Sequence, residues 1–306
     1  MRSRPLKSLA VVLCVSLVPL LLAACGGASS APTTTATTSS LPPIGQPPQP
    51  TGPPSRAGLD AVRQAAAHTL TKKLGISVEY KNPTPSVTAP RIGASGWFNL
   101  SRATGVEDVH DPTGEETIVF LPQRVFVLPA KSEVVGLPHG KTWVRADFNE
   151  HLPGRSAGAL SEFLLRLKAR DIGFLLSQLA WGAKTAAPLG HRGIAGKPAT
   201  GYLVHVDLDR AAAAAAGPSA KGFVRLAALA KHAHGGGHAS DQTIWVWLDG
   251  SNRVVALRAS TPGSGIGTTL MNVTSFGRLA VTPTTPPADA VVDVATLTPA
   301  GDNDGD

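Results

Sequence analysis

One stretch of the sequence alternates apolar and polar residues along its length: Tyr202-Leu203-Val204-His205-Val206-Asp207-Leu208. A period of two places successive side chains on opposite faces of a strand, as in antiparallel sheets that pack one face on the core. A second stretch, Ile76-Ser77-Val78-Glu79-Tyr80-Lys81, alternates in the same way. Both stretches therefore predict half-buried antiparallel strands.

The order of the remaining elements predicts the fold class. Further apolar runs, several of them bounded by turn residues, predict strands over 93–100, 116–121, 124–128, 141–147, 243–249, 252–259, 268–275 and 278–282. Apolar residues at helical spacing predict helices over 58–74, 159–170, 171–181 and 210–216, with 219–231 as a candidate extension. Helix, strands, helices and strands again indicate an α+β domain with a large antiparallel sheet.

Some predicted strands are apolar on both faces, and Ile244-Trp245-Val246-Trp247-Leu248 is the clearest case. Residues 118–121 and 124–128 share this feature. A sheet that faces water on one side does not need such strands. Two interpretations follow: either both faces are densely covered, or one face borders a cavity.

The N-terminus predicts a lipid-anchored protein. Three cationic residues precede an apolar run from Leu9 to Ala24, which ends in Leu22-Ala23-Ala24-Cys25. This pattern is typical of a bacterial lipobox, in which a peptidase cuts after Ala24 and the Cys25 thiol carries a diacylglycerol thioether. The acyl chains would hold the protein on the outer face of the cell membrane. An ordinary signal peptide or an uncleaved anchor is the alternative interpretation.

Composition divides the 306 residues into four parts. Residues 1–24 form the predicted signal peptide, and residues 25–57 form a tether rich in Pro, Thr and Ser. Residues 58–297 are long enough for one well-cored domain, and residues 298–306 read as an acidic tail. The tether would place the domain beyond the lipid head groups.

Charge and cysteine content exclude several functions. The net charge of +7 includes three cations of the predicted signal peptide, and no basic run follows, which argues against a nucleic-acid partner. Both cysteines, Cys14 and Cys25, lie at the N-terminus. The domain therefore has no thiol for a disulfide, a zinc thiolate site or a nucleophile, and no cofactor is predicted.

Short motifs along the chain resemble the LppX/LprG-type lipoproteins of mycobacteria and related actinomycetes, within the LolA-like superfamily. They follow the lipobox and the tether in the family's order: Ser77-Val78, 136–143, 196–202, Trp245-Val246-Trp247-Leu248-Asp249, Ser275-Phe276-Gly277, Pro286-Pro287 and Val291-Val292-Asp293. Together they span most of residues 58–297. The long linker, the Ala-rich break at 211–216 and the His-rich loop at 232–238 depart from the family pattern.

This resemblance implies a curved, half-barrel antiparallel sheet with helices packed over its concave face. It also implies an apolar cavity that holds acyl chains of a lipid or glycolipid, in proteins that carry lipids across the envelope and are not enzymes. The candidate residues for the helical wall of the cavity are Leu160, Phe163, Leu164, Leu167, Phe174, Leu175 and Leu179. The simpler interpretation of each is an ordinary core residue.

A serine hydrolase motif is present but lies in the wrong context. Gly154-Arg155-Ser156-Ala157-Gly158 matches the nucleophile elbow, which needs a buried strand before its first glycine. Pro153 is incompatible with a central strand, so Ser156 is better explained as a loop or N-cap residue.

Several histidines lie close together in the sequence, which is one feature of a metal site. His232, His234, His238 and Asp241 surround three consecutive glycines, which would leave the ligands poorly fixed. An exposed loop is the simpler interpretation, and no metal is predicted. Three functions remain: a lipid carrier, a lipoprotein with a filled core that presents a surface to a protein partner, and a tethered hydrolase that uses Ser156.

Overall fold

A computed structural model of the chain describes residues 47–81, 92–111, 114–129, 137–147, 167, 170–215, 220, 222–224, 227–228, 241–260, 268–277 and 282–297. Within these ranges, none of the helices is long and apolar enough to span a membrane. The predicted signal peptide, Cys25 and the acidic tail lie outside the described residues.

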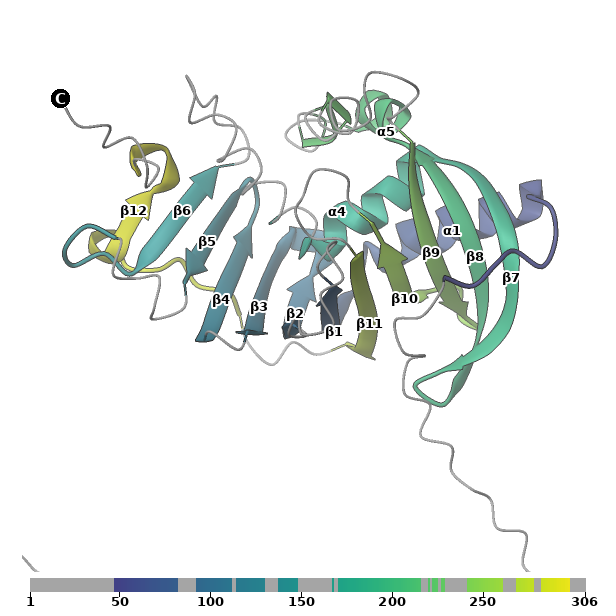
Figure 1. Ribbon diagram of the computed structural model, residues 1–306, viewed down its shortest axis with the longest axis horizontal. Coiled ribbons are helices and arrows are strands. Elements are labelled where there is room, and N and C mark those ends of the chain that lie inside the picture. The colour runs from purple at the N-terminus through teal and green to yellow at the C-terminus, as the bar shows by residue number, and fades with distance from the viewer. Residues whose placement is uncertain are drawn as a thin grey trace, which may run out of the picture. The chain divides into compact units, whose positions relative to one another are not determined.

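One sheet of 12 strands organises the domain, in the order β12-β6-β5-β4-β3-β2-β1-β11-β10-β9-β8-β7 (Figure 1). The strands are β1 Lys73–Lys81, β2 Ile92–Asn99, β3 Thr104–Asp111, β4 Gly114–Leu121, β5 Arg124–Leu128, β6 Trp143–Asp147, β7 Ala183–Ile194, β8 Lys197–Asp207, β9 Asp241–Asp249, β10 Val254–Ala259, β11 Thr268–Phe276 and β12 Val291–Asp293. Neighbours pair antiparallel except β12, which pairs parallel with β6. The sheet does not close, because β12 and β7 are its edges. The predicted α+β class and large antiparallel sheet are confirmed.

Helix α1 (Arg56–Thr69) begins where the Ser55 side chain accepts a hydrogen bond from the Gly58 amide at 3.0 Å. Its buried face packs against the strands at the β7 end of the sheet. The helix ends earlier than predicted, because Thr69 bonds backwards to the Ala65 carbonyl at 2.7 Å and accepts from the Val254 amide of β10 at 2.9 Å. Lys73 then already belongs to β1.

The helix predicted over 171–181 is observed as α4 (Ile172–Ser177) followed by one π-helical segment, η2 (Gln178–Gly182). Its N-terminus is capped by Asp171, whose Oδ1 accepts from the Phe174 amide at 3.2 Å. The apolar face of α4 joins α1 and the inner face of the sheet in one core cluster. Helix α5 (Leu208–Ala214) begins two residues before its predicted start, with Asp207 as its cap.

Residues 47–55, which we call the strap, cross the β7 edge of the sheet. The amides of Thr51 and Ser55 donate to the carbonyls of Pro188 and Ala186 on β7, at 2.8 and 3.1 Å. The sequence analysis predicted that these residues belong to the tether. The strap instead supplies partners to an edge strand whose carbonyls would otherwise face solvent.

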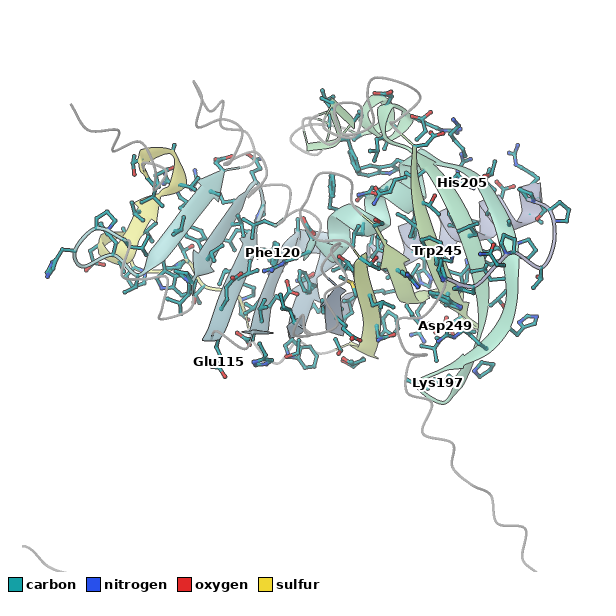
Figure 2. The ribbon with its side chains drawn as sticks, viewed as in Figure 1. Glu115, Phe120, Lys197, His205, Trp245 and Asp249 are labelled. Atoms are coloured by element: carbon teal, nitrogen blue, oxygen red, sulfur yellow. The ribbon has the colours of Figure 1, made fainter. Side chains whose placement is uncertain are left out.

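The outer face of β7–β10 is also covered, which is the first of the two interpretations of the doubly apolar strand at 244–248. Trp247 is 4% exposed and packs with Ile194, Ala199 and Ala256 in a second cluster outside the main core. The guanidinium of Arg192 lies 4.8 Å from the Trp247 ring centroid. Figure 2 shows Trp245 on the same strand, and its Nε1 donates to the strap carbonyl of Pro48 at 3.2 Å.

The main strands match the predicted ranges to within a few residues, whereas β3, β7 and β12 were not predicted. The predicted strand at 278–282 lies almost wholly outside the described residues, and Thr282 itself is in no strand. Short 3-10 segments, η1 (Leu100–Arg102), η3 (Ala288–Ala290) and η4 (Val294–Thr296), complete the described elements.

Candidate functional site

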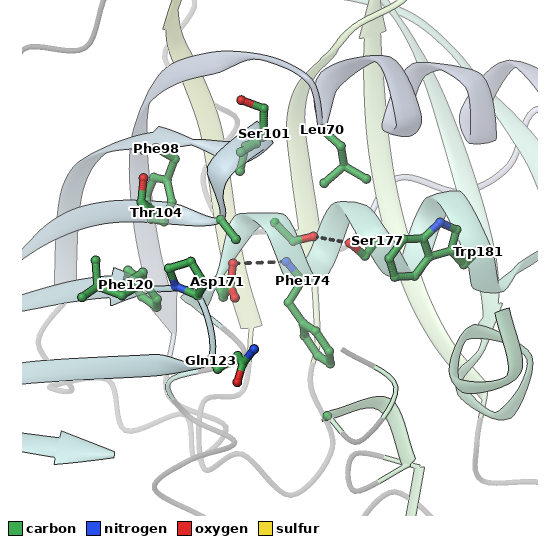
Figure 3. Close-up of a pocket in the computed structure, with 16 residues that line it drawn as sticks. Leu70, Phe98, Ser101, Thr104, Phe120, Gln123, Asp171, Phe174, Ser177 and Trp181 are labelled. Carbon is green, nitrogen blue, oxygen red and sulfur yellow. Dashed lines mark hydrogen bonds between the residues drawn. The ribbon is translucent and has the colours of Figure 1, made fainter. Parts of the chain in front are cut away.

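A pocket of about 480 Å³ opens between α4 and the inner face of β2–β4. This volume lies within the range of about 300–1,000 Å³ that small-molecule sites occupy. Figure 3 shows the pocket, which is lined by Leu70, Phe98, Leu100, Ser101, Ala103, Thr104, Phe120, Leu121, Pro122, Gln123, Asp171, Gly173, Phe174, Ser177, Trp181 and Gly222.

The floor of the pocket is aromatic because of a glycine. Strand pairing places Gly105 of β3 between Phe98 of β2 and Phe120 of β4. A Cβ at Gly105 would overlap the Phe98 ring, so only glycine lets that ring lie across β3. The two phenylalanine rings then approach to 5.4 Å between centroids, and both are at most 4% exposed.

The helical wall comes from α4 and η2. Phe174 and Trp181, seven positions apart, line the pocket, and both rings pack on the fully buried Phe223. Phe174 stacks on Phe223 at 4.4 Å, and Trp181 meets the same ring edge-on at 5.9 Å. Aromatic pairs at these separations hold their rings in fixed orientations, which keeps this wall in place.

The rim is polar and exposed, in contrast to the floor. Ser101, Ala103 and Gln123 are exposed, and Asp171 is half-buried. Two of these residues adopt left-handed backbone conformations, Ala103 with φ of 50° and Gln123 with φ of 71°. Such conformations are unfavourable outside glycine and concentrate at functional sites. At Gln123 the tight turn after Pro122 requires a left-handed backbone conformation.

Of the seven residues predicted for the cavity wall, Phe174 lines the pocket. Leu167, Leu175 and Leu179 are at most 2% exposed and belong to the main core cluster, outside the pocket lining. Leu160, Phe163 and Leu164 lie outside the described residues. The pocket is thus built largely by strand and turn residues that helical periodicity could not identify.

The other candidate sites lie mostly outside the residues that the structure describes. Ser156 and the three histidines at 232, 234 and 238 lie outside the described residues. Asp241 opens β9, and its Oδ1 lies 3.4 Å from Nζ of Lys184. The residues that the structure describes contain no group of three or more His, Cys, Asp or Glu side chains that could hold a metal ion.

Comparison with known proteins finds similarity in structure. No family model and no curated protein matches the sequence. LprF from Mycobacterium bovis is 12% identical, with a TM-score of 0.41 over 77% of this chain and 99% of that protein. Lipoprotein LppX from Mycobacterium tuberculosis is 15% identical, with a TM-score of 0.40 over 74% and 98% of the two chains.

A LolA-superfamily protein from Nitrosomonas europaea is 8% identical, with a TM-score of 0.29 over 76% of this chain and 96% of that protein. Lipoprotein LppX and a LolA-superfamily protein are thus among the solved structures to which this chain is similar.

Proposed function

We propose that the protein is a lipid-anchored envelope lipoprotein that binds a lipid or glycolipid in the pocket between α4 and β2–β4. The observation that carries this proposal is the pocket itself, a hollow of about 480 Å³ with an aromatic floor and a polar rim. A buried methylene group contributes about 0.8 kcal/mol to binding, so even part of an acyl chain would bind measurably there.

The proposed role is binding and carriage rather than catalysis. Among the described residues that line the pocket, Asp171 is the one with an ionisable side chain, and it already caps α4. The Ser177 hydroxyl donates to the Gly173 carbonyl at 2.7 Å, within the same helix. These groups support the helix, whereas a nucleophile would need a base within hydrogen-bond reach.

Lipid extraction of protein purified from its own host tests the binding proposal. Gly173 lines the pocket from α4, and a Cβ there would lie 3.2 Å from Oδ1 of Asp171 and 3.5 Å from Cδ2 of Leu100. Gly173→Leu should fill the hollow, and co-purifying lipid should fall severalfold while the domain stays folded. Ala213→Leu, on the exposed side of α5, is the matched control and should retain lipid.

A wild-type protein that carries no lipid would favour the alternative, a lipoprotein with a filled core that presents a surface to a protein partner. The packed leucines of α4 and η2 are the observation behind that alternative, because Leu175 and Leu179 are fully buried.

The anchor is proposed from the sequence, in which Cys25 follows Leu22-Ala23-Ala24. Cys25→Ala should move the protein from the detergent phase to the aqueous phase, because the mutant cannot carry the acyl chains. Unchanged partitioning would exclude Cys25 as the anchor.

A further inference from the structure

The strap fixes the place where the chain from the proposed anchor reaches the domain. Its Pro48 carbonyl accepts a hydrogen bond from Nε1 of Trp245, on the outer face of β9 (Figure 1). Between Cys25 and the strap lie only residues 26–46. A coil of that length spans about 25 Å. An acylated Cys25 would therefore keep the outer face of β7–β10 close to the membrane.

Two cations lie on this outer face. Strand pairing sets Arg192 beside Ala199 and Lys197 beside Ile194. Both apolar partners belong to the outer cluster around Trp247, and directly paired residues of neighbouring strands point to the same face. Lys197 is exposed, and Figure 2 shows it at the turn where β8 begins.

A half-buried tryptophan lies beside a third cation on the same face. Trp245 is paired with Arg258 of β10, whose guanidinium lies 5.4 Å from the ring centroid. Tryptophan concentrates where proteins meet lipid head groups, and cations concentrate on surfaces that meet anionic membranes. Burial lowers the pKa of Arg192 and of Arg258. A nearby anion would offset this effect, because it stabilises the charged guanidinium.

The acids of strands β7–β10 are three aspartates, and each lies close to another cation. Oδ2 of Asp249 lies 2.6 Å from Nη2 of Arg253. At the other end of these strands, carboxylate oxygens of Asp207 and Asp241 lie 3.7 and 3.4 Å from Nζ of Lys184. These aspartates therefore leave the cations between the two ends of the face available to an external anion.

We propose that the outer face of β7–β10 docks on the anionic phospholipid head groups of the membrane that carries the anchor. Arg192 and Lys197 would meet lipid phosphates, and Trp245 would lie at the level of the head groups. This inference rests on the proposed anchor at Cys25. The acyl chains would supply most of the affinity. The charged face would decide which side of the domain is turned towards the bilayer.

The experiment measures how fast an amine-reactive reagent labels single lysines of the full lipid-anchored protein, reconstituted into vesicles. The vesicles consist of phosphatidylcholine alone or of equal parts phosphatidylcholine and phosphatidylglycerol. Lys197 should be labelled severalfold more slowly on the anionic vesicles, and added salt should remove this protection. Lys141 is the internal control. Its Nζ donates to the Asp289 carbonyl at the β12 end of the sheet, and its labelling should not depend on the lipid.

Arg192→Gln removes one cation from the face and should weaken the protection of Lys197 about fivefold. Arg210→Gln is the matched control, because it removes the same charge from an exposed position of α5, which packs on the main core. Arg192→Lys keeps the charge and should keep the protection. Loss of protection in both Arg192 variants would show that packing on Trp247 matters instead of charge, and would overturn the inference.

Other outcomes separate this inference from the proposed anchor. Equal labelling of Lys197 on the two kinds of vesicle would overturn the docking face and leave the anchor intact. Equal loss of protection in Arg192→Gln and Arg210→Gln would also overturn it, because attraction would then follow the total charge of the domain. If the protein leaves the phosphatidylcholine vesicles, the anchor fails. Protection of Lys197 by the anionic vesicles would then still support the docking face, and its absence would overturn it.

Discussion

On the inner face of β2–β4, in the middle of the sheet, Phe98 and Phe120 face α4 beside a pocket, whereas on the outer face of β7–β10 Trp247 is buried and the half-buried Trp245 bonds to the strap. Both regions present large aromatic side chains on the sheet. The coverings differ: the strap and Arg192 lie over the tryptophans, whereas α4 lies over the phenylalanines and leaves a pocket between itself and the sheet. Aromatic side chains on one sheet can thus be packed over closely or can border a pocket.

The largest expected effect is a difference in stability between two Leu→Ala variants. Leu179 is fully buried in the core, so Leu179→Ala should lower the free energy of unfolding by about 2–5 kcal/mol. Leu70 is half-buried and borders the pocket, so Leu70→Ala should cost only about 1 kcal/mol. Urea denaturation measures both, and equal losses would show that the pocket lining is as densely packed as the core.

The stability that the β7–β10 region contributes to the fold should also depend on pH. Burial of Asp249 tends to raise its pKa, but hydrogen bonds from Arg253 and Ser251 outweigh burial and hold that pKa below its ordinary value. A carboxyl with a lowered pKa in the folded state stabilises the protein above the unfolded pKa of about 3.9 and loses this contribution as the pH falls.

Asp249→Asn should therefore lower stability at pH 7 by about 1.5–3 kcal/mol, the contribution of hydrogen bonds to a charged group. Denaturation of both proteins at pH 7 and pH 3 should show this gap narrowing at the lower pH. Asp289→Asn, an exposed aspartate in η3, serves as control. A gap that stays constant would mean that the loop needs the shape of the side chain and not its charge.

The smallest effect concerns the strap. Trp245→Phe keeps an aromatic ring on the outer face but removes the donor to the Pro48 carbonyl, a bond that contributes about 1 kcal/mol. We expect faster hydrogen exchange at the Thr51 amide, which donates to Pro188. Trp143→Phe on β6, far along the sheet, should leave that exchange rate unchanged, and an equal change in both variants would contradict the docked strap.

Of the three strands that the sequence analysis did not predict, β3 and β7 were missed for reasons that the structure explains. Strand β3 has acids at three of its eight positions, and Glu107 points inward with 0% exposure, which breaks the alternation expected of a strand. Strand β7 contains Pro188, which argues against a central strand. It is allowed there because β7 is the edge of the sheet.

The pocket could be predicted only in part. Phe174 follows from the apolar stripe of its helix, but Ala103, Gln123 and Asp171 come from turns and a helix cap, and they lie together only after the sheet has formed. Pro122, between the predicted strands 116–121 and 124–128, is typical of a turn, but nothing near it in the sequence places that turn on the rim of a pocket. Gly105 is the signal that sequence reasoning missed, since a glycine within a strand often marks a close approach of other groups.

Most of the described local structure could be predicted from the sequence, because alternation, helical stripes and caps act between residues a few positions apart. The sequence alone also predicts the lipobox at Cys25, which is a contiguous motif. The sequence could not show which apolar surfaces are covered, because covering depends on the folded arrangement of distant segments. Pro48 reaches Trp245 across 197 positions of the chain, and such contacts depend on how the whole sheet brings distant segments together.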